Sequence, residues 1–237
     1  MNPYRFYQDA YQTELDTQVV RLEGNRLVLT DTIFYPHGGG QPGDSGELIV
    51  GDQRIAIVDT RYSPDRSAIE HFLDEAACEG LGLSEGDGVT ITLNWARRHR
   101  HMRMHSCLHL LCYLIKDPVT GGNVGTDLSR AEFDLSEPLD KAELEARLNA
   151  TIAEGALVST EWLPESILDE QPELVRTMSV QPPRGHGAIR MVRVEGLDYQ
   201  PCGGTHVNNI AEIGKVRIPS IKSKGKQNKR INIELVD

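Results

Sequence analysis

The first ninety residues contain short runs rich in apolar residues, separated by turn-forming residues. Short apolar runs between turn signals are typical of β-strands. The strands predicted in this way are Arg26–Leu29, Glu47–Val50, Arg54–Val58 and Val89–Leu93. A glycine-rich stretch, HGGGQPGDSG, separates the first two, and a helix is predicted near Ala68–Cys78. Short strands at this spacing favour a small antiparallel barrel or sandwich.

The pattern changes at Trp95. Residues 96–116 contain no helix breaker, and Leu108, Leu111 and Leu114 recur at helical spacing. This segment therefore predicts one long helix, which ends at the following Asp-Pro pair because the residue before a proline disfavours helical angles.

A second helix is predicted over residues 141–154, with Asp140 as its N-cap and an apolar stripe of Leu144, Leu148 and Ile152. Further strands are predicted at Ala131–Leu135, Leu157–Trp162, Ile189–Val194, Lys215–Ile218 and Ile231–Val236. The predicted fold class is α+β. We expect a β-rich, barrel-like domain over residues 1–94 and a second domain over residues 95–237, in which helices pack on an antiparallel sheet.

Composition places the chain among globular proteins. Apolar residues make up 39% and charged residues 25% of its 237 residues, which excludes global disorder. No apolar run approaches the roughly 20 residues of a membrane span, and the N-terminus lacks a signal-peptide pattern. The four cysteines form no C-x-x-C pair, which favours a reduced compartment and metal or structural roles. We expect a cytoplasmic protein with no membrane partner and no obligate protein partner.

Charge is unevenly distributed along the chain. The formal net charge of −10 argues against a general nucleic-acid coat protein, yet the segment between Gly214 and Arg230 is basic without any acidic residue. A second basic segment, Arg97–Arg103, contains four arginines, and its His99 and His101 are expected at the surface. Such segments can bind a polyanion locally, or can simply be solvated surface. The candidates for RNA contact are Lys222, Lys224, Lys226, Lys229 and Arg230.

Histidines and a cysteine form two short motifs with the spacing of metal ligands. His105 and His109, four residues apart on the predicted helix, leave it on the same face. Cys202 and His206 enclose two glycines, which let the chain fold back on one centre. Three imidazoles and one thiolate suit zinc, a borderline-soft ion without redox chemistry. The sequence predicts one zinc ion per chain, with Cys107 pointing away from it into the core.

Four segments carry a wider resemblance. They are TDTIFYPHGGGQPGDSG at Thr30–Gly46, RMHSCLHLL, PCGGTHV and, towards the C-terminus, EIGKVRIPSIKSKGKQNKRINIEL. Together and in this order they resemble the editing domain of alanyl-tRNA synthetases and the freestanding AlaX-type alanyl-tRNA editing proteins. The chain length favours the freestanding form. The resemblance implies a β-barrel-like first domain, an α+β second domain, and hydrolysis of seryl-tRNA(Ala) and, in some members, glycyl-tRNA(Ala).

The resemblance also implies roles for individual residues. The zinc ligands of the family correspond to His105, His109, Cys202 and His206. Thr32 falls where the family reads the serine hydroxyl. A site built to hydrogen-bond that hydroxyl can reject alanine by about 10⁴–10⁵-fold, because its own polar groups are then left unpaired, whereas a size filter cannot reject alanine because alanine is smaller. Gly38, Gly39 and Gly40 are expected to bring backbone N–H groups to the substrate, and Gln41 adds a side-chain amide.

Three classes of function remain to be separated. The first is an editing hydrolase. The second is a non-catalytic RNA-binding protein, because four protein ligands are typical of structural zinc whereas hydrolysis needs a displaceable position or a fifth ligand. The third is a zinc hydrolase acting on a small molecule, although the H-E-x-x-H motif of the common zinc proteases is missing. Release of serine from charged tRNA separates the first class from the others.

Overall fold

The computed structural model describes residues 4–78, 80–135, 137–176, 187–225 and 227–236. Contacts divide the chain into two compact units, residues 1–38 with 42–99 and residues 39–41 with 100–237. Helix α3 (Trp95–Leu114) contributes residues to both units, and three residues of the glycine-rich stretch belong to the second. In the part of the chain described here, we find no helix with the length and apolar character of a membrane span.

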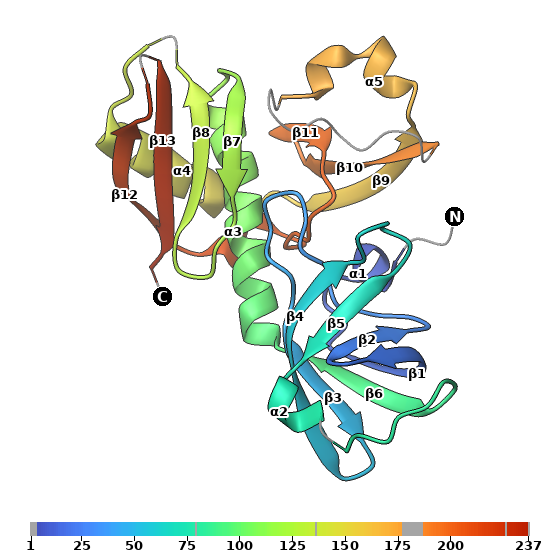
Figure 1. Cartoon of the computed structure of the whole chain (residues 1–237). Coiled ribbons are helices and arrows are strands. Elements are labelled where there is room, and N and C mark those ends of the chain that lie inside the picture. Colours follow the sequence, from blue (N-terminus) through green and yellow to red (C-terminus); the bar gives the residue numbers. More distant parts are fainter. Residues whose placement is uncertain (1–3, 79, 136, 177–186, 226, 237) are drawn as a thin grey trace. The chain divides into compact units, whose positions relative to one another are not determined.

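The first unit is built around a closed antiparallel barrel in the order β1-β2-β5-β4-β3-β6 (Figure 1). Its strands are β1 (Glu14–Glu23), β2 (Arg26–Leu29), β3 (Gly46–Val50), β4 (Gln53–Tyr62), β5 (Ile69–Leu73) and β6 (Gly88–Leu93). Apolar side chains such as Leu27, Leu48 and Ile91 fill the interior and are fully buried. Two short helices, α1 (Arg5–Gln8) and α2 (Glu75–Cys78), accompany the barrel. The prediction of a small barrel is confirmed.

The helix predicted near Ala68–Cys78 is wrong over most of its length. Its first part forms β5, which pairs with both β2 and β4 and thereby completes the barrel. Only the alanine-rich end is helical, in α2, where Asp74 Oδ1 accepts a hydrogen bond from Ala76 N at 3.0 Å. Pairing on both edges of β5 outweighs the local helix preference of this segment.

The second unit contains two antiparallel sheets (Figure 1). The three-stranded sheet, in the order β11-β10-β9, consists of β9 (Val158–Pro164), β10 (Ala188–Val194) and β11 (Asp198–Pro201). The four-stranded sheet, in the order β12-β13-β8-β7, consists of β7 (Val119–Asn123), β8 (Ser129–Asp134), β12 (Val216–Ser223) and β13 (Asn228–Leu235). Short helical segments are α5 (Ile167–Glu170), η1 (Pro172–Leu174) and η2 (Ile210–Ile213).

Helix α4 (Lys141–Ala153) packs against the four-stranded sheet (Figure 1). Asp140 caps it as predicted, since its side chain accepts a hydrogen bond from Glu143 N at 2.9 Å. The predicted stripe of Leu144, Leu148 and Ile152 is buried. These residues confirm the position of the helix. The α+β class predicted for the chain agrees with the antiparallel sheets and the helices α3 and α4.

The C-terminal half of α3 is enclosed on nearly all sides. From His101 to Cys112, every residue except Arg103 is buried. A helix buried all round has no solvent face, so polar side chains within it lie in the interior. The surface position expected for His101 is therefore wrong: the residue is 0% exposed, and its Nε2 lies 3.2 Å from Thr126 Oγ1.

Arg98, in the segment predicted to be basic surface, forms a buried ion pair in the first unit. Its Nε donates to the two carboxylate oxygens of Asp44 at 3.1 and 3.0 Å, and its Nη2 also donates to Oδ2 of the same residue. Further bonds run to the carbonyl oxygens of Ile33 (2.7 Å) and Ala10 (2.9 Å). This arginine therefore joins the start of α3 to the glycine-rich segment and is not available to RNA.

Candidate metal centre

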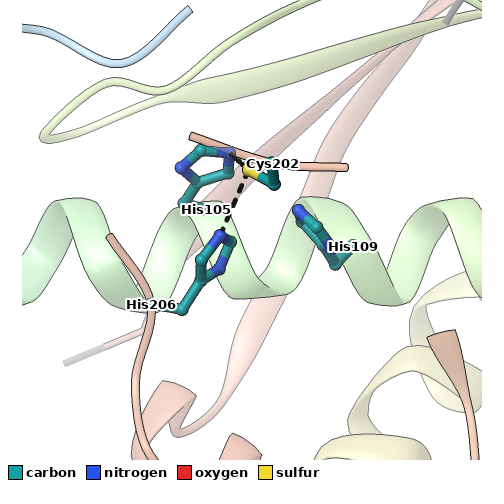
Figure 2. A group of neighbouring side chains, drawn as sticks. All are labelled: His105, His109, Cys202 and His206. Atoms are coloured by element: carbon teal, nitrogen blue, oxygen red, sulfur yellow. Dashed lines mark hydrogen bonds between the residues drawn. The ribbon is translucent and has the colours of Figure 1, made fainter. Parts of the chain in front are cut away.

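Four side chains with metal-binding atoms meet in the second unit (Figure 2). His105 and His109 lie on successive turns of α3, while Cys202 and His206 lie in the segment that follows β11. Their ligand atoms are all within 4.8 Å of one another, and Cys202 Sγ lies 3.3 Å from His206 Nε2 and 3.5 Å from His105 Nε2. Tetrahedral bonds of about 2.0–2.3 Å separate ligand atoms by roughly 3.3–3.6 Å. The group predicted from the sequence is assembled and could hold a metal ion.

Each histidine of the cluster directs its Nδ1 atom at a further side chain. The pairs are His105 with Gln41 Oε1 at 2.9 Å, His109 with Asp198 Oδ2 at 2.8 Å, and His206 with Ser106 Oγ at 3.1 Å. An amide oxygen and a carboxylate only accept, so the neutral rings of the first two carry their hydrogen on Nδ1. That tautomer leaves Nε2 as the metal-binding atom, and partners of this kind also fix the ring orientation.

Gln41 reaches this cluster from the glycine-rich stretch. Its Oε1 accepts a second hydrogen bond, from Thr205 N at 3.1 Å, and its Nε2 donates to Thr205 Oγ1 at 2.9 Å. The side chain is 0% exposed. In the structure Gln41 therefore orients a candidate ligand, while the contact with substrate predicted from the sequence stays a prediction.

The turn between the second pair of ligands is shaped by a glycine and an arginine. A Cβ atom at Gly204 would lie 2.0 Å from His105 Cε1, so any side chain there would displace a ligand. The φ of this glycine is not in the left-handed region. Space rather than backbone freedom requires it, which corrects the expectation from the sequence. Arg190 Nη1 donates to the carbonyl oxygens of Cys202 and Gly204, both at 2.8 Å.

Electrostatics in the cluster favour a thiolate. Burial by itself raises the pKa of Cys202, but the neighbouring His105 and His206 bring it well below its ordinary value. Burial and His105 hold the pKa of His206 well below its usual range. Burial opposes protonation of His109 as well, yet Asp198 and Cys202 raise its pKa to about 10, so this ring carries an extra proton as long as no metal is bound. Thiolate and neutral imidazole are the forms that bind soft or borderline metal ions, so a metal ion would displace that proton from His109.

Cys107 lies on α3 between the two histidines and is fully buried, as predicted. Burial raises the pKa of its thiol to about 12. It is therefore an inert core residue.

Thr32 belongs to the first unit, just after β2. It is 5% exposed, its Oγ1 accepts a hydrogen bond from Phe34 N at 3.0 Å, and the same oxygen lies 2.7 Å from His71 Nε2.

The three glycines that follow divide between the units. Gly38 lies in the first unit, where its carbonyl oxygen accepts the Tyr35 hydroxyl hydrogen at 3.0 Å. Gly39 and Gly40 lie in the second unit with φ of 56° and 80°, and the carbonyl of Gly40 accepts from Val124 N at 2.7 Å. A tight turn requires glycine at both of the last two positions. Their contact with substrate stays a prediction.

Four of the five candidate RNA-contacting residues, Lys222, Lys224, Lys229 and Arg230, lie on the β12–β13 hairpin. Lys222 and Lys224 are exposed, and Lys226 lies outside the described residues. Lys229 Nζ donates to Ser223 Oγ at 3.0 Å. Exposed cations on one hairpin are compatible with phosphate contact.

Arg230, the last of these candidates, is paired. Its Nη2 lies 2.6 Å from Glu132 Oε1 on β8. Beside it opens a cavity of about 170 Å³, lined by Leu128, Arg130, Lys222, Arg230 and Asn232. Arg130, which was not among the predicted RNA contacts, thus lies beside two that were.

Several residues of the centre were missed from the sequence. Asp198 lies 89 positions from the histidine that it contacts, and a single sequence contains no signal that joins them. Ser106 is adjacent to His105 within HSCLH, so its neighbourhood could have suggested it. Gln200 Nε2, which donates to Asp198 Oδ2 at 2.8 Å, carries no such signal.

Comparisons with known proteins match both ends of the chain to tRNA synthetase families. Residues 189–232 match the family model described as the threonyl and alanyl tRNA synthetase second additional domain. Residues 5–97 match the model described as tRNA synthetases class II (A). The first of these matches includes two of the candidate ligands, Cys202 and His206.

Similar proteins extend the match to the whole chain. The alanyl-tRNA editing protein AlaX-M of Methanosarcina barkeri is 33% identical over 98% of this chain and 98% of its own length. AlaX-M of Methanosarcina acetivorans is 31% identical over the full length of both chains. The alanine–tRNA ligase of Ignicoccus hospitalis is 30% identical over 92% of this chain but only 24% of the ligase. With a relative that matches it from end to end at this identity, the chain belongs to the family of AlaX-type alanyl-tRNA editing proteins.

Proposed function

We propose that this editing protein hydrolyses the ester bond of mischarged tRNA(Ala), chiefly of seryl-tRNA(Ala), with glycyl-tRNA(Ala) as a second substrate. The observation that carries the proposal is the cluster of three histidines, each held through Nδ1, around a cysteine whose thiolate is favoured. Family membership supports the substrate class, because relatives are named for alanyl-tRNA editing.

The proposal includes one zinc ion, held by His105, His109, Cys202 and His206. Three nitrogen donors and one sulfur suit zinc better than calcium or magnesium, which prefer oxygen ligands. When bound, zinc supplies a positive charge that can polarise an oxygen or fix the shape of a pocket. The protein contributes the orientation of its ligands, through hydrogen bonds such as that between Asp198 and His109.

The test of the function is single-turnover deacylation of seryl-, glycyl- and alanyl-tRNA(Ala). We expect rapid release of serine, measurable release of glycine and little release of alanine. The same tRNA(Ala) transcript is charged with each amino acid in turn, so that the three substrates share the same RNA contacts. Binding of the RNA without release of serine would leave a non-catalytic RNA-binding protein as the alternative.

Thr32→Val is expected to lower the serine-to-alanine rate ratio by about 2- to 13-fold. Valine keeps the shape of threonine and removes one hydroxyl, and a lost neutral hydrogen bond costs about 0.5–1.5 kcal/mol. The loss should fall on seryl-tRNA, since an apolar wall suits the methyl group of alanine. Thr30→Val is the matched control, because Thr30 is exposed and its hydroxyl lies 3.1 Å from Thr17 Oγ1. Equal slowing of both substrates would mean that Thr32 supports only the fold or the shared ester.

Charge reversal of the hairpin tests how tRNA is bound. Reversing Lys222, Lys224 and Lys229 should weaken binding and flatten its log–log salt dependence by about 0.7–0.9 for each lost phosphate contact. As a control, Arg54 and Arg61, which are exposed on β4 of the first unit, are replaced by acidic residues in the same way. A salt dependence equal to that of wild type would show that the hairpin lysines are solvated surface.

A further inference from the structure

A buried histidine contacts the hydroxyl of Thr32. His71 lies on β5 and is 0% exposed, and its Nε2 lies 2.7 Å from Thr32 Oγ1. Its other ring nitrogen, Nδ1, lies 3.1 Å from the carbonyl oxygen of Leu27 on β2. All three residues belong to the first unit.

The carbonyl partner fixes the tautomer of this histidine. A carbonyl oxygen only accepts, so Nδ1 carries the hydrogen. Burial lowers the pKa of His71 to about 4, which keeps the ring neutral near pH 7. The ring of Phe34 packs against His71 in an edge-to-face arrangement, with 5.4 Å between the ring centroids, and the carboxylate of the adjacent Glu70 is paired with Arg21 and Arg26. The Nε2 atom is therefore unprotonated and can only accept.

The direction of the hydrogen bond at Thr32 follows. Because His71 Nε2 accepts, the Thr32 hydroxyl must donate its only hydrogen to it. One lone pair of the same oxygen already accepts from Phe34 N at 3.0 Å. A hydroxyl has one hydrogen and two lone pairs. Among the residues that the structure describes, the contacts with His71 and Phe34 therefore leave one lone pair of the Thr32 hydroxyl able to accept a further hydrogen bond.

We infer that His71 determines specificity by holding the Thr32 hydroxyl as a hydrogen-bond acceptor, so that the protein selects an aminoacyl side chain that donates a hydrogen bond. This inference rests on the proposed reading of serine by Thr32. Without His71 the hydroxyl could rotate and donate, and a substrate that only accepts would be tolerated. Serine donates to the acceptor, whereas alanine leaves it unpaired, which a desolvated site penalises. Glycine leaves the acceptor unpaired in the same way, so this contact predicts slower release of glycine than of serine.

A series of substrates tests, with the wild-type protein, whether the side chain of the amino acid must donate a hydrogen bond. Fluorine in 3-fluoroalanine is close to a hydroxyl in size but has no hydrogen to donate. We expect 3-fluoroalanyl-tRNA(Ala) to be released at nearly the rate of alanyl-tRNA(Ala), after both rates are divided by those of spontaneous hydrolysis. Release at the rate of seryl-tRNA(Ala) would overturn the inference.

A pair of variants tests His71 itself. His71→Leu removes the acceptor and should lower the serine-to-alanine rate ratio by about 2- to 13-fold. His71→Gln can present an amide oxygen near the position of Nε2 and should restore most of the ratio. In a Thr32→Val background, His71→Leu should leave the ratio unchanged, because no hydroxyl remains to be oriented. Thermal unfolding of each variant shows whether the substitution destabilises the fold. A destabilised fold should lower the deacylation rates of both substrates alike.

Histidine ¹⁵N NMR separates the failure of this inference from the failure of the proposed function. We expect a bare Nε2 and a protonated Nδ1 for His71 at pH 7. Hydrogen on Nε2, or an unchanged ratio in His71→Leu while Thr32→Val lowers it, would overturn the role of His71 and leave the role of Thr32 standing. An unchanged ratio in Thr32→Val would refute serine reading by Thr32, and the role of His71 with it.

Discussion

Cys202→Ala is expected to lose both the bound zinc and the release of serine. The change removes the only sulfur of the cluster and leaves three imidazoles. Loss of a residue that merely orients a ligand typically lowers metal affinity 10- to 100-fold, so loss of a ligand should cost on the order of 100-fold or more. Elemental analysis after growth with added zinc should give one ion per wild-type chain and far less in the variant. Single-turnover deacylation is measured on the same samples.

Cys107→Ala is the matched control for this experiment. Cys107 lies on the same helix between His105 and His109, but it is a buried core residue without a place in the cluster. The control should keep its zinc and its activity while losing a little stability. A full zinc content in Cys202→Ala, or no zinc in the wild type, would refute the proposed metal centre. Zinc loss without loss of activity would assign the metal a purely structural role.

Arg98→Met should lower the free energy of unfolding by about 3–5 kcal/mol. Removing one member of a buried ion pair leaves the other charge without compensation, and here Asp44 is 1% exposed. The carbonyl oxygens of Ile33 and Ala10 lose a donor in the same change. Denaturant titration of the full chain, followed by circular dichroism, measures the loss.

Two further variants show whether the cost is due to the buried charge. Adding Asp44→Asn to Arg98→Met should restore part of the stability, because the uncompensated charge is then gone. Arg54→Ala breaks an exposed pair with Glu47 and should cost no more than about 1 kcal/mol. If Arg98→Met costs no more than Arg54→Ala, the Arg98–Asp44 pair does not stabilise the barrel unit.

Local sequence patterns predicted the elements that bury one face and expose the other, such as α4. The stripe of α4 begins beside a capping aspartate, and both features are local in the sequence. The ligands His105 and His109 were predicted for the same reason, since four residues on a helix place two side chains on one face. The metal motif CGGTH was likewise contained in five residues.

Elements that depend on distant partners could not be predicted in this way. Strand β1 buries Thr17 along with Val19, so no apolar alternation marks it. The burial of Arg98 and His101 follows from the packing around α3, while their charge and polarity suggested a surface. The acceptors at the Nδ1 atoms come from other segments, as with Asp198 and Gln41.

Residues Gly39–Gln41 belong to the second unit although the residues on both sides of them belong to the first. This arrangement limits how the centre could be transferred to another protein. A gene segment that encodes residues 95–237 specifies all four candidate ligands, yet it lacks the amide that receives Nδ1 of His105. Fusing that segment to another protein would transfer a centre with one imidazole unsupported. The smallest portable unit of this centre therefore includes the glycine-rich stretch as well as residues 95–237.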